Sequence, residues 1–183
     1  MNHTNLLSVI TGGPGSGKTT LINTLNSHGI KTTAESGRKI IQEQVSGNGN
    51  ALPWLDPAAF AGLMFNLEKL EYYKAIEANE VIIFDRGIPD VTGYLRLMNL
   101  PVPGYMDYAA RNLRYNRKVF IAPPWPEIFE QDAERKQTFE EALQTFEFMF
   151  ETYSSYGYTL IVLPMVSVEE RTAFVLEKLN YII

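Results

Sequence analysis

The sequence predicts a three-layer α/β fold, in which a doubly wound, five-stranded parallel sheet carries helices on both faces. Two observations predict it. Five short apolar runs rich in β-branched residues alternate with longer segments of helical periodicity. The longer runs are almost continuously apolar, which is typical of strands buried on both faces of a parallel sheet. Strands that alternate with helices indicate βαβ units.

The expected strands lie at residues 6–11, 31–34, 81–84, 119–122 and 159–163. Helices are expected from Gly17 onward and at residues 37–45, 56–78, 89–97, 105–115, 138–156 and 167–179. Asp56 can cap the third of these, with Pro57 at its first position. Ser167 can cap the last, with Glu170 three residues on. Because ligands bind at the carboxyl ends of the strands in such sheets, functional residues are expected directly after each run.

The segment TGGPGSGKTT, residues 11–20, joins the first expected strand to the first expected helix. Its spacing, Gly12-x4-Gly17-Lys18-Thr19, fits the phosphate-binding P-loop pattern. Glycines let backbone N–H groups point inward around an anion, and the helix start adds its positive dipole end. Lys18 would then reach the β- and γ-phosphates, and the Thr19 hydroxyl would ligate Mg²⁺. The predicted nucleotide-contacting residues are Gly12, Gly13, Pro14, Gly15, Ser16, Gly17, Lys18, Thr19 and Thr20.

The alternative for this segment is a glycine-rich turn that contains a lysine by chance. Average residue usage makes such a match a roughly 1% event in a chain of this length. The apolar strand before the motif and the amphipathic helix after it are the context that the pattern requires. The chain has no Asn-Lys-x-Asp sequence, the usual guanine-specific signal. The sequence therefore predicts ATP with Mg²⁺, and adenine held by apolar contact from residues 164–167 and from the lid that follows the fourth expected strand.

Length and composition bound the class of protein. The chain has 183 residues, 45% hydrophobic and 20% charged, which predicts one globular domain over residues 1–183. The absence of cysteine excludes a disulfide framework and a cysteine nucleophile. The net charge of −5 disfavours nucleic acid as a partner. No signal-peptide pattern is present, and no stretch reaches the ~18 apolar residues of a membrane span, so a cytoplasmic protein without a membrane partner is expected.

Asp85 directly follows the apolar residues 81–84. This form is typical of a Walker B strand, whose carboxylate orients Mg²⁺ together with the P-loop hydroxyl of Thr19. The alternative is a strand-ending Asp that caps the next turn. Arg86 can counter developing negative charge or grip a substrate. Alternatively, it forms an ion pair with Glu35, which follows the second expected strand.

A basic lid is expected over about residues 123–138. Its first residues, PPWP, cannot continue a strand, and a charged segment then leads to Thr138, which can cap the next helix. Cations that fold in on closure suit phosphoryl transfer, because positioning and charge stabilisation dominate its catalysis. The candidates are Arg135 and Lys136. The alternative is a solvated face on which they pair with Asp132 or Glu140.

Further candidates have weaker signals. Trp54 and Phe60 can stack on a base or a sugar, or belong to the core. The polar residues that could line an acceptor pocket after the third strand are Asp90, Tyr94 and Arg96. The arginines spaced three apart, which could hold an anionic acceptor or form a solvated face, are Arg111, Arg114 and Arg117. His3 and His28 are far apart in the sequence, so a histidine metal site is not expected.

Four motifs together resemble those of a known family. They are GGPGSGKTT, TAESGRKI after the second expected strand, FDRGIPD after the third, and DAERK in the lid. In order and spacing they resemble the AAA-type "predicted ATPase" P-loop proteins, which are related to ribosylnicotinamide kinases and, more distantly, to deoxynucleoside and thymidylate kinases. The resemblance implies that Glu35 acts as base toward a substrate hydroxyl. It also implies that Asp85 and Arg86 serve metal and substrate, and that Arg135 closes over the phosphates.

Two functions agree with these residues. The first is an ATP-dependent kinase that transfers the γ-phosphoryl group to a hydroxyl of a nucleoside-like small molecule. Its catalytic residues would be Lys18, Glu35, Asp85, Arg86 and Arg135. The second is an ATP- or GTP-binding regulatory module whose closed form recruits a partner. The same fold serves both uses, so the fold does not decide between them.

Overall fold

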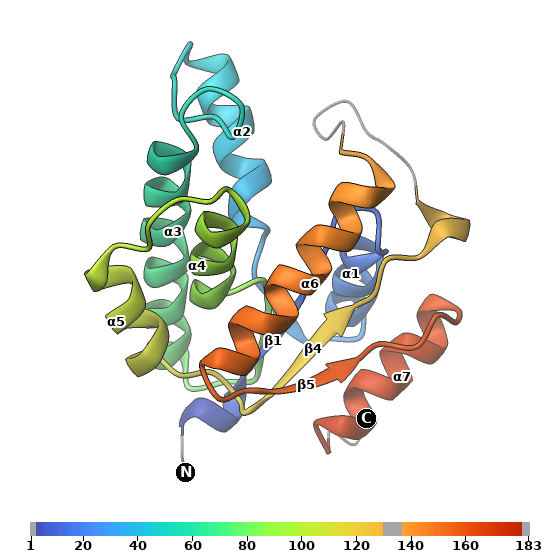
Figure 1. Ribbon diagram of the computed structural model, residues 1–183. Coiled ribbons are helices and arrows are strands. Elements are labelled where there is room, and N and C mark those ends of the chain that lie inside the picture. The colour runs from blue at the N-terminus through green and yellow to red at the C-terminus, as the bar shows by residue number, and fades with distance from the viewer. Residues whose placement is uncertain (1–2, 130–136, 181–183) are drawn as a thin grey trace.

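A computed structural model describes residues 3–129 and 137–180 of the chain, and it has the predicted architecture (Figure 1). All neighbouring strands of the sheet are parallel, in the order β2-β3-β1-β4-β5. The strands are β1 (Leu7–Gly12), β2 (Lys31–Thr32), β3 (Ile82–Asp85), β4 (Lys118–Ala122) and β5 (Thr159–Val162). Parallel neighbours that are not consecutive in the chain are joined by crossover connections, and this strand order confirms the doubly wound sheet.

Each expected helix is present among the described residues, with ends shifted by a few positions. The helices are α1 (Lys18–Ser27), α2 (Ser36–Ser46), α3 (Pro57–Ala78), α4 (Ile88–Leu97), α5 (Gly104–Asn112), α6 (Phe139–Ser155) and α7 (Val168–Lys178). Short 3-10 turns lie at His3–Leu6 and Pro126–Ile128. The Asp56 carboxylate accepts from the Ala59 amide at 2.9 Å, and Thr138 and Ser167 form capping boxes at the starts of α6 and α7. The expected caps are therefore confirmed.

Two expected elements are shorter than the apolar pattern suggested. β2 has two residues rather than four, although the Thr33 amide still donates to the Ile83 carbonyl at 3.0 Å before the chain turns into α2. α5 ends at Asn112, because the chain must reach the sheet, where the Asn116 amide donates to the Leu7 carbonyl at 2.7 Å. In both cases a tertiary contact sets the boundary.

The sheet separates two hydrophobic cores. Leu7 and Val9 of β1 face the larger core, which contains buried residues from α2 to α6. Ile10 faces the opposite way, into a smaller core with α1 and α7. Alternation of β1 side chains between two covered faces is what a parallel strand buried on both sides requires. It also places the end of β1, where the P-loop begins, at the centre of the molecule.

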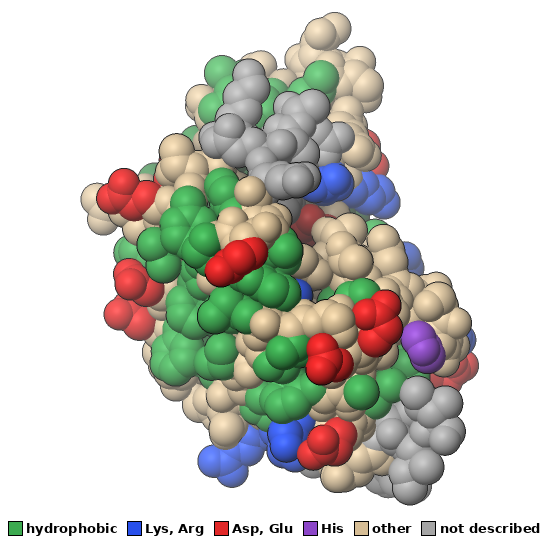
Figure 2. Space-filling model, turned by 90° about the vertical axis from the view of Figure 1, so that its right-hand side faces the viewer, with side chains coloured by type: hydrophobic (Ala, Val, Ile, Leu, Met, Phe, Trp, Pro, Cys, Tyr) green, Lys and Arg blue, Asp and Glu red, His purple; other side chains and the backbone are tan. Residues whose placement is uncertain are grey.

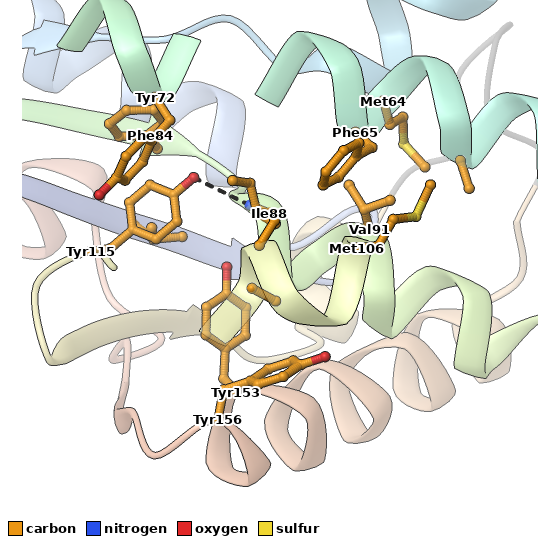
Figure 3. Packing of buried hydrophobic residues seen from close by; sticks show 14 of the residues in the cluster. Met64, Phe65, Tyr72, Phe84, Ile88, Val91, Met106, Tyr115, Tyr153 and Tyr156 are labelled. Atoms are coloured by element: carbon orange, nitrogen blue, oxygen red, sulfur yellow. Dashed lines mark hydrogen bonds between the residues drawn. The ribbon is translucent and has the colours of Figure 1, made fainter. Parts of the chain in front are cut away.

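Aromatic packing in the larger core fixes the segment after β3. The Tyr115 ring lies edge-on to Phe84 and Tyr72, with centroids 5.1 and 5.3 Å apart (Figure 3). The Tyr115 hydroxyl accepts from the Ile88 amide at 3.3 Å. This bond satisfies a free N–H at the first turn of α4. The start of α4 is therefore held directly behind the end of β3.

Figure 2 views the molecule from the side on which α7 lies. Hydrophobic side chains gather on this face, with acidic side chains scattered among them. β5 is the edge strand of the sheet, and its Val162 is 47% exposed. The sheet is therefore covered less completely at this edge than at its centre. Among the described residues, no helix combines the length and apolar character that crossing a membrane would need.

Candidate functional site

The P-loop is shaped by glycines that no other residue could replace without strain. Gly15 and Gly17 have φ values of +67° and +74°, in the left-handed region. A Cβ on Gly15 would come within 2.4 Å of the Phe129 ring, and one on Gly17 within 2.7 Å of the Arg171 guanidinium. Phe129 and Arg171 therefore pack against the loop at the positions where a side chain would stand.

The Lys18 ammonium lies over the loop. Lys18 is only 5% exposed, and its Nζ donates to the Gly13 carbonyl at 2.5 Å and to the Ser16 hydroxyl at 3.2 Å. Ser16 in turn donates to Gly13 at 2.8 Å. A cavity of about 120 Å³ borders this segment. Its lining residues are Pro14, Gly15, Ser16, Gly17, Lys18, Thr19, Thr20, Arg38, Phe129 and Gln137. A cation set among loop amides at a helix start has the chemistry of an anion site.

A second cavity, of about 490 Å³, brings Thr19 and Asp85 together with Glu35. Asp85 is buried at the end of β3, where it is in register with Ile10 of β1, and its amide donates to the Thr33 hydroxyl at 3.1 Å. Hydroxyl and carboxylate oxygens are hard ligands that suit Mg²⁺. No group of three or more His, Asp or Glu able to hold a metal occurs in the described part of the chain. The residues therefore fit an ion held by few protein ligands and completed by phosphates and water.

Arg86 connects the P-loop to the residues after β2. The backbone φ of Arg86 is +76°, which is uncommon for any residue other than glycine. The guanidinium donates to Glu35 at 3.0 Å, to the Gly12 carbonyl at 3.1 Å and to Asp90 at 3.4 Å. Burial lowers the pKa of Arg86, but the nearby carboxylates, Glu35 first, outweigh burial and raise it above its ordinary value. The ion pair with Glu35, one of the two sequence-based alternatives, is therefore present in this structure.

Asp90 holds this arrangement in place. Its carboxylate accepts from the hydroxyls of Thr11 on β1 and Tyr153 on α6, and from the Gly87 amide at 2.8 Å. Both hydroxyl donors are buried. A buried carboxylate with several donors is well satisfied, and it links β1, α4 and α6.

A third cavity, of about 410 Å³, opens beside the Glu35–Arg86 pair. Its polar lining includes Glu35, Ser36, Glu68, Arg86 and Asp90. Its apolar lining includes Trp54, Phe60, Met64, Leu97, Met98 and Met149. The three cavities share residues: Pro14 and Gln137 border the first and third, Thr19 and Arg38 the first and second, and Glu35 the second and third. They therefore adjoin one another around the carboxyl ends of β1, β2 and β3.

Sequence reasoning missed Glu68, which lies on α3 and is 4% exposed. The Ser36 hydroxyl donates to it at 2.6 Å. Burial, the largest influence, raises the pKa of Glu68 to about 8, the Ser36 bond lowers it, and the charges of Asp90 and Asp85 add to the rise. The signal was available, because Glu68 falls in the stripe of buried α3 residues. A carboxyl group in such a stripe is unusual and indicates a special environment.

Arg171 of α7 was missed as well. It is buried, and its guanidinium donates to the Ser16 carbonyl at 3.1 Å and lies 5.8 Å from the centre of the Trp125 ring. Burial lowers its pKa. Arg171 shares the buried face of α7 with Val175 and Leu176, which was the available signal. Arg171 and Lys18 therefore bond to two different carbonyls of the P-loop, Ser16 and Gly13 respectively.

The weaker candidates divide between cavity and surface. Trp54, Phe60, Asp90 and Tyr94 line the third cavity. Three of the candidate arginines donate hydrogen bonds elsewhere: Arg96 to Ser155, Arg111 to Asp107, and Arg114 to the Tyr156 carbonyl. These three arginines and Arg117 do not line any of the three cavities. His28 donates from Nδ1 to the Thr24 carbonyl of α1 at 2.8 Å. Arg135, Lys136 and Asp132 lie outside the described residues, whereas Phe129 and Gln137, on either side of that gap, border the P-loop cavity.

Comparisons with known proteins agree with this architecture. A family model described as an AAA domain matches residues 7–171. Among curated proteins, none matches the sequence. Solved structures with the same fold include deoxyadenosine kinase from M. mycoides, at 16% identity and a TM-score of 0.65, covering 96% of this chain and 100% of that chain. Thymidylate kinase from Ehrlichia chaffeensis has 16% identity and a TM-score of 0.64, covering 96% and 98%.

A further match is the NadR protein solved in complex with NR, at 17% identity and a TM-score of 0.68. It covers 99% of this chain but 53% of that one, so this chain spans about half the length of NadR. At these identities the likeness establishes the fold, and function has to be argued from the site.

Proposed function

Because the chain belongs to the AAA domain family, whose P-loop it carries intact, we propose that it is an ATP-dependent small-molecule kinase. It transfers the γ-phosphoryl group of ATP to a hydroxyl of a nucleoside-like acceptor, with Mg²⁺. Residues 1–183 act as one P-loop domain, with a lid at about 123–138. The observation that carries the proposal is that Glu35 borders both the cavity that holds Thr19 and Asp85 and the cavity lined by Arg86 and Asp90.

On the nucleotide side, the loop amides and Lys18 bind the phosphates. Thr19 and Asp85 hold Mg²⁺, which when bound neutralises charge on the phosphate oxygens. This division needs no rearrangement of α1 or β3, since Thr19 and Asp85 already border one cavity. Arg135 and Lys136 are proposed to fold over the phosphates, and this remains a prediction.

On the acceptor side, Glu35 accepts the proton of the acceptor hydroxyl or orients that hydroxyl by a hydrogen bond. The hydroxyl oxygen forms a bond to the γ-phosphorus while the bond from phosphorus to the ADP oxygen breaks, and the proton passes to the Glu35 carboxylate. Arg86 holds Glu35 at 3.0 Å and can at the same time attract the transferring group. The kinases of similar fold act on nucleosides or nucleotides according to their names, which supports an acceptor of this kind.

The test is a screen of nucleosides and related metabolites with ATP labelled in the γ-phosphate. We expect label in an acceptor product, dependence on Mg²⁺, and no product with Lys18→Ala. Slow release of labelled phosphate without any labelled acceptor would contradict the kinase proposal. That result, together with a partner captured only in the presence of a non-hydrolysable nucleotide, would instead favour a regulatory module.

A further inference from the structure

The charge of the third cavity restricts its acceptor, and this inference rests on the proposed function. The carboxyl groups among its lining residues belong to Glu35, Glu68, Asp90 and Glu141. Arg86 is the only cation among the described lining residues. Its guanidinium is already bonded to Glu35 at 3.0 Å and to Asp90 at 3.4 Å. A phosphate or carboxylate placed here would therefore meet more negative charge than positive.

Tyr94 offers a polar group that the protein itself does not satisfy. Its hydroxyl is buried, borders this cavity, and has no hydrogen-bond partner within the described residues. The ring is fixed by an edge-on contact with Phe60, with centroids 5.5 Å apart. A buried hydroxyl left without a partner is destabilising, and such groups in native structures call for an explanation. A hydrogen bond to a bound ligand supplies one.

Glu68 offers a second polar group on the opposite helix, α3. Ser36 is its one hydrogen-bond partner in the described part of the chain, and no cation pairs with it there. Its raised pKa keeps a large share of this carboxyl protonated near neutral pH, when it can donate as well as accept. A ring carbonyl or amide can bond to the protonated carboxyl, and a positively charged ring can pair with its ionised form.

We propose that the acceptor is a hydroxyl-bearing ring compound without negative charge, a nucleoside rather than a nucleotide, and that Tyr94 and Glu68 bind the polar groups of its ring. The apolar side chains of Phe60, Met64 and Met149 enclose the ring itself. Phosphorylation of such an acceptor yields an anion that this cavity binds poorly, which favours product release.

The first experiment compares charge states on the unmodified protein. Binding of deoxyadenosine, thymidine and nicotinamide riboside, each paired with its 5′-monophosphate, is measured by calorimetry with Mg²⁺ and a non-hydrolysable ATP analogue. We expect at least one nucleoside to bind, and its monophosphate to bind about 100-fold more weakly. Tighter binding of monophosphates, or no binding by any of the six, would overturn the inference. Binding of a nucleoside without phosphoryl transfer would overturn the proposed function alone.

The second experiment tests Tyr94 with the nucleoside that binds best. Tyr94→Phe should weaken its binding about three- to tenfold, the range of a lost neutral hydrogen bond. The melting temperature without ligand should stay the same or rise, because a buried hydroxyl without a partner is removed. Tyr108→Phe is the control, since Tyr108 is exposed on α5. A lower melting temperature with unchanged binding would assign Tyr94 a purely structural role.

The third experiment tests Glu68 with a pair of ligands that differ in charge at nearly constant shape, the pyridinium form of nicotinamide riboside and its dihydropyridine form. Glu68→Gln keeps the shape and the ability to donate but cannot become anionic. It should weaken the pyridinium form by about tenfold or more and change the dihydro form by less than about threefold. Equal effects on both forms would contradict a direct role for Glu68. If the variant does not fold, the monophosphate comparison above still decides the inference.

Discussion

The P-loop and the third cavity lie side by side but are built in different ways. The P-loop is nine consecutive residues, 12–20, whose shape comes from glycine dihedral angles and from bonds within the loop, such as those of Ser16 and Lys18 to the Gly13 carbonyl. The walls of the third cavity come from α2, α3, α4 and α6 and from loop residues such as Trp54 and Arg86. Under the proposed function, the first construction binds the phosphate chain. The second can differ between proteins without altering the first, so we expect it to determine which acceptor is used.

The two regions are also supported differently. Arg171 and Phe129 pack against the P-loop where its glycines lack side chains. The cavity depends on Asp90, which joins β1, α4 and α6 through buried hydrogen bonds. Substitutions in the P-loop should therefore affect nucleotide binding alone. Substitutions in the cavity wall should also lower the free energy of unfolding.

The largest expected effect is that of Lys18→Ala. Removing the buried ammonium should weaken Mg²⁺–ATP binding by about 10³-fold, because a charged hydrogen-bond partner of the phosphates is lost. Calorimetric titration measures it. Lys69→Ala, at an exposed position of α3, is the control and should change nothing. Unchanged nucleotide affinity in Lys18→Ala would refute the P-loop assignment.

Asp90→Ala tests the support of the cavity. It leaves the hydroxyls of Thr11 and Tyr153 without their buried acceptor and removes one of the two carboxylates that pair with Arg86, so we expect a loss of about 3 kcal/mol in the free energy of unfolding. Urea denaturation measures it. Asp107→Ala, which removes the half-exposed pair with Arg111, should cost less than about 1 kcal/mol. Similar values for the two variants would mean that Asp90 is not a structural centre.

The smallest expected effect is that of Trp54→Ala, at the edge of the cavity. Trp54 is 58% exposed, so the melting temperature should not change. Loss of a ring contact should raise the KM for the acceptor by about threefold, with kcat unaffected. Leu55→Ala is a matched control, since Leu55 is equally exposed but does not border the cavity. A lower melting temperature in Trp54→Ala alone would place Trp54 in the core instead.

The sequence predicted the fold and the P-loop because the information for both is local. Apolar runs specify the strands, and a ten-residue motif contains all the glycines that the loop conformation uses. Glu35 and Asp85 could be found because they follow strands, and strand ends meet at one edge of a parallel sheet. Position in a predicted element was enough for these residues.

The cavity could not be predicted in the same way, because its contacts join distant parts of the chain. Thr11 and Asp90 are 79 positions apart, and Asp90 and Tyr153 are 63 apart. The ion pair between Arg86 and Glu35 also depends on the folded arrangement, and so does the left-handed backbone conformation of Arg86. Glu68 and Arg171 could have been suspected as charged residues in buried helix stripes, but nothing in the sequence says what they face.

The most direct test of the separation between nucleotide side and acceptor side uses Glu35→Gln beside Asp85→Asn. Affinity for Mg²⁺–ATP, turnover with an acceptor, and melting temperature are measured on both variants. Asp85→Asn should weaken the Mg²⁺-dependent part of nucleotide affinity, because an amide is a poor ligand for a hard cation. Glu35→Gln should change nucleotide affinity by less than about threefold while turnover falls by about 10²–10⁴-fold. Equal losses of nucleotide affinity in the two variants, or a lower melting temperature with turnover preserved in Glu35→Gln, would contradict the account.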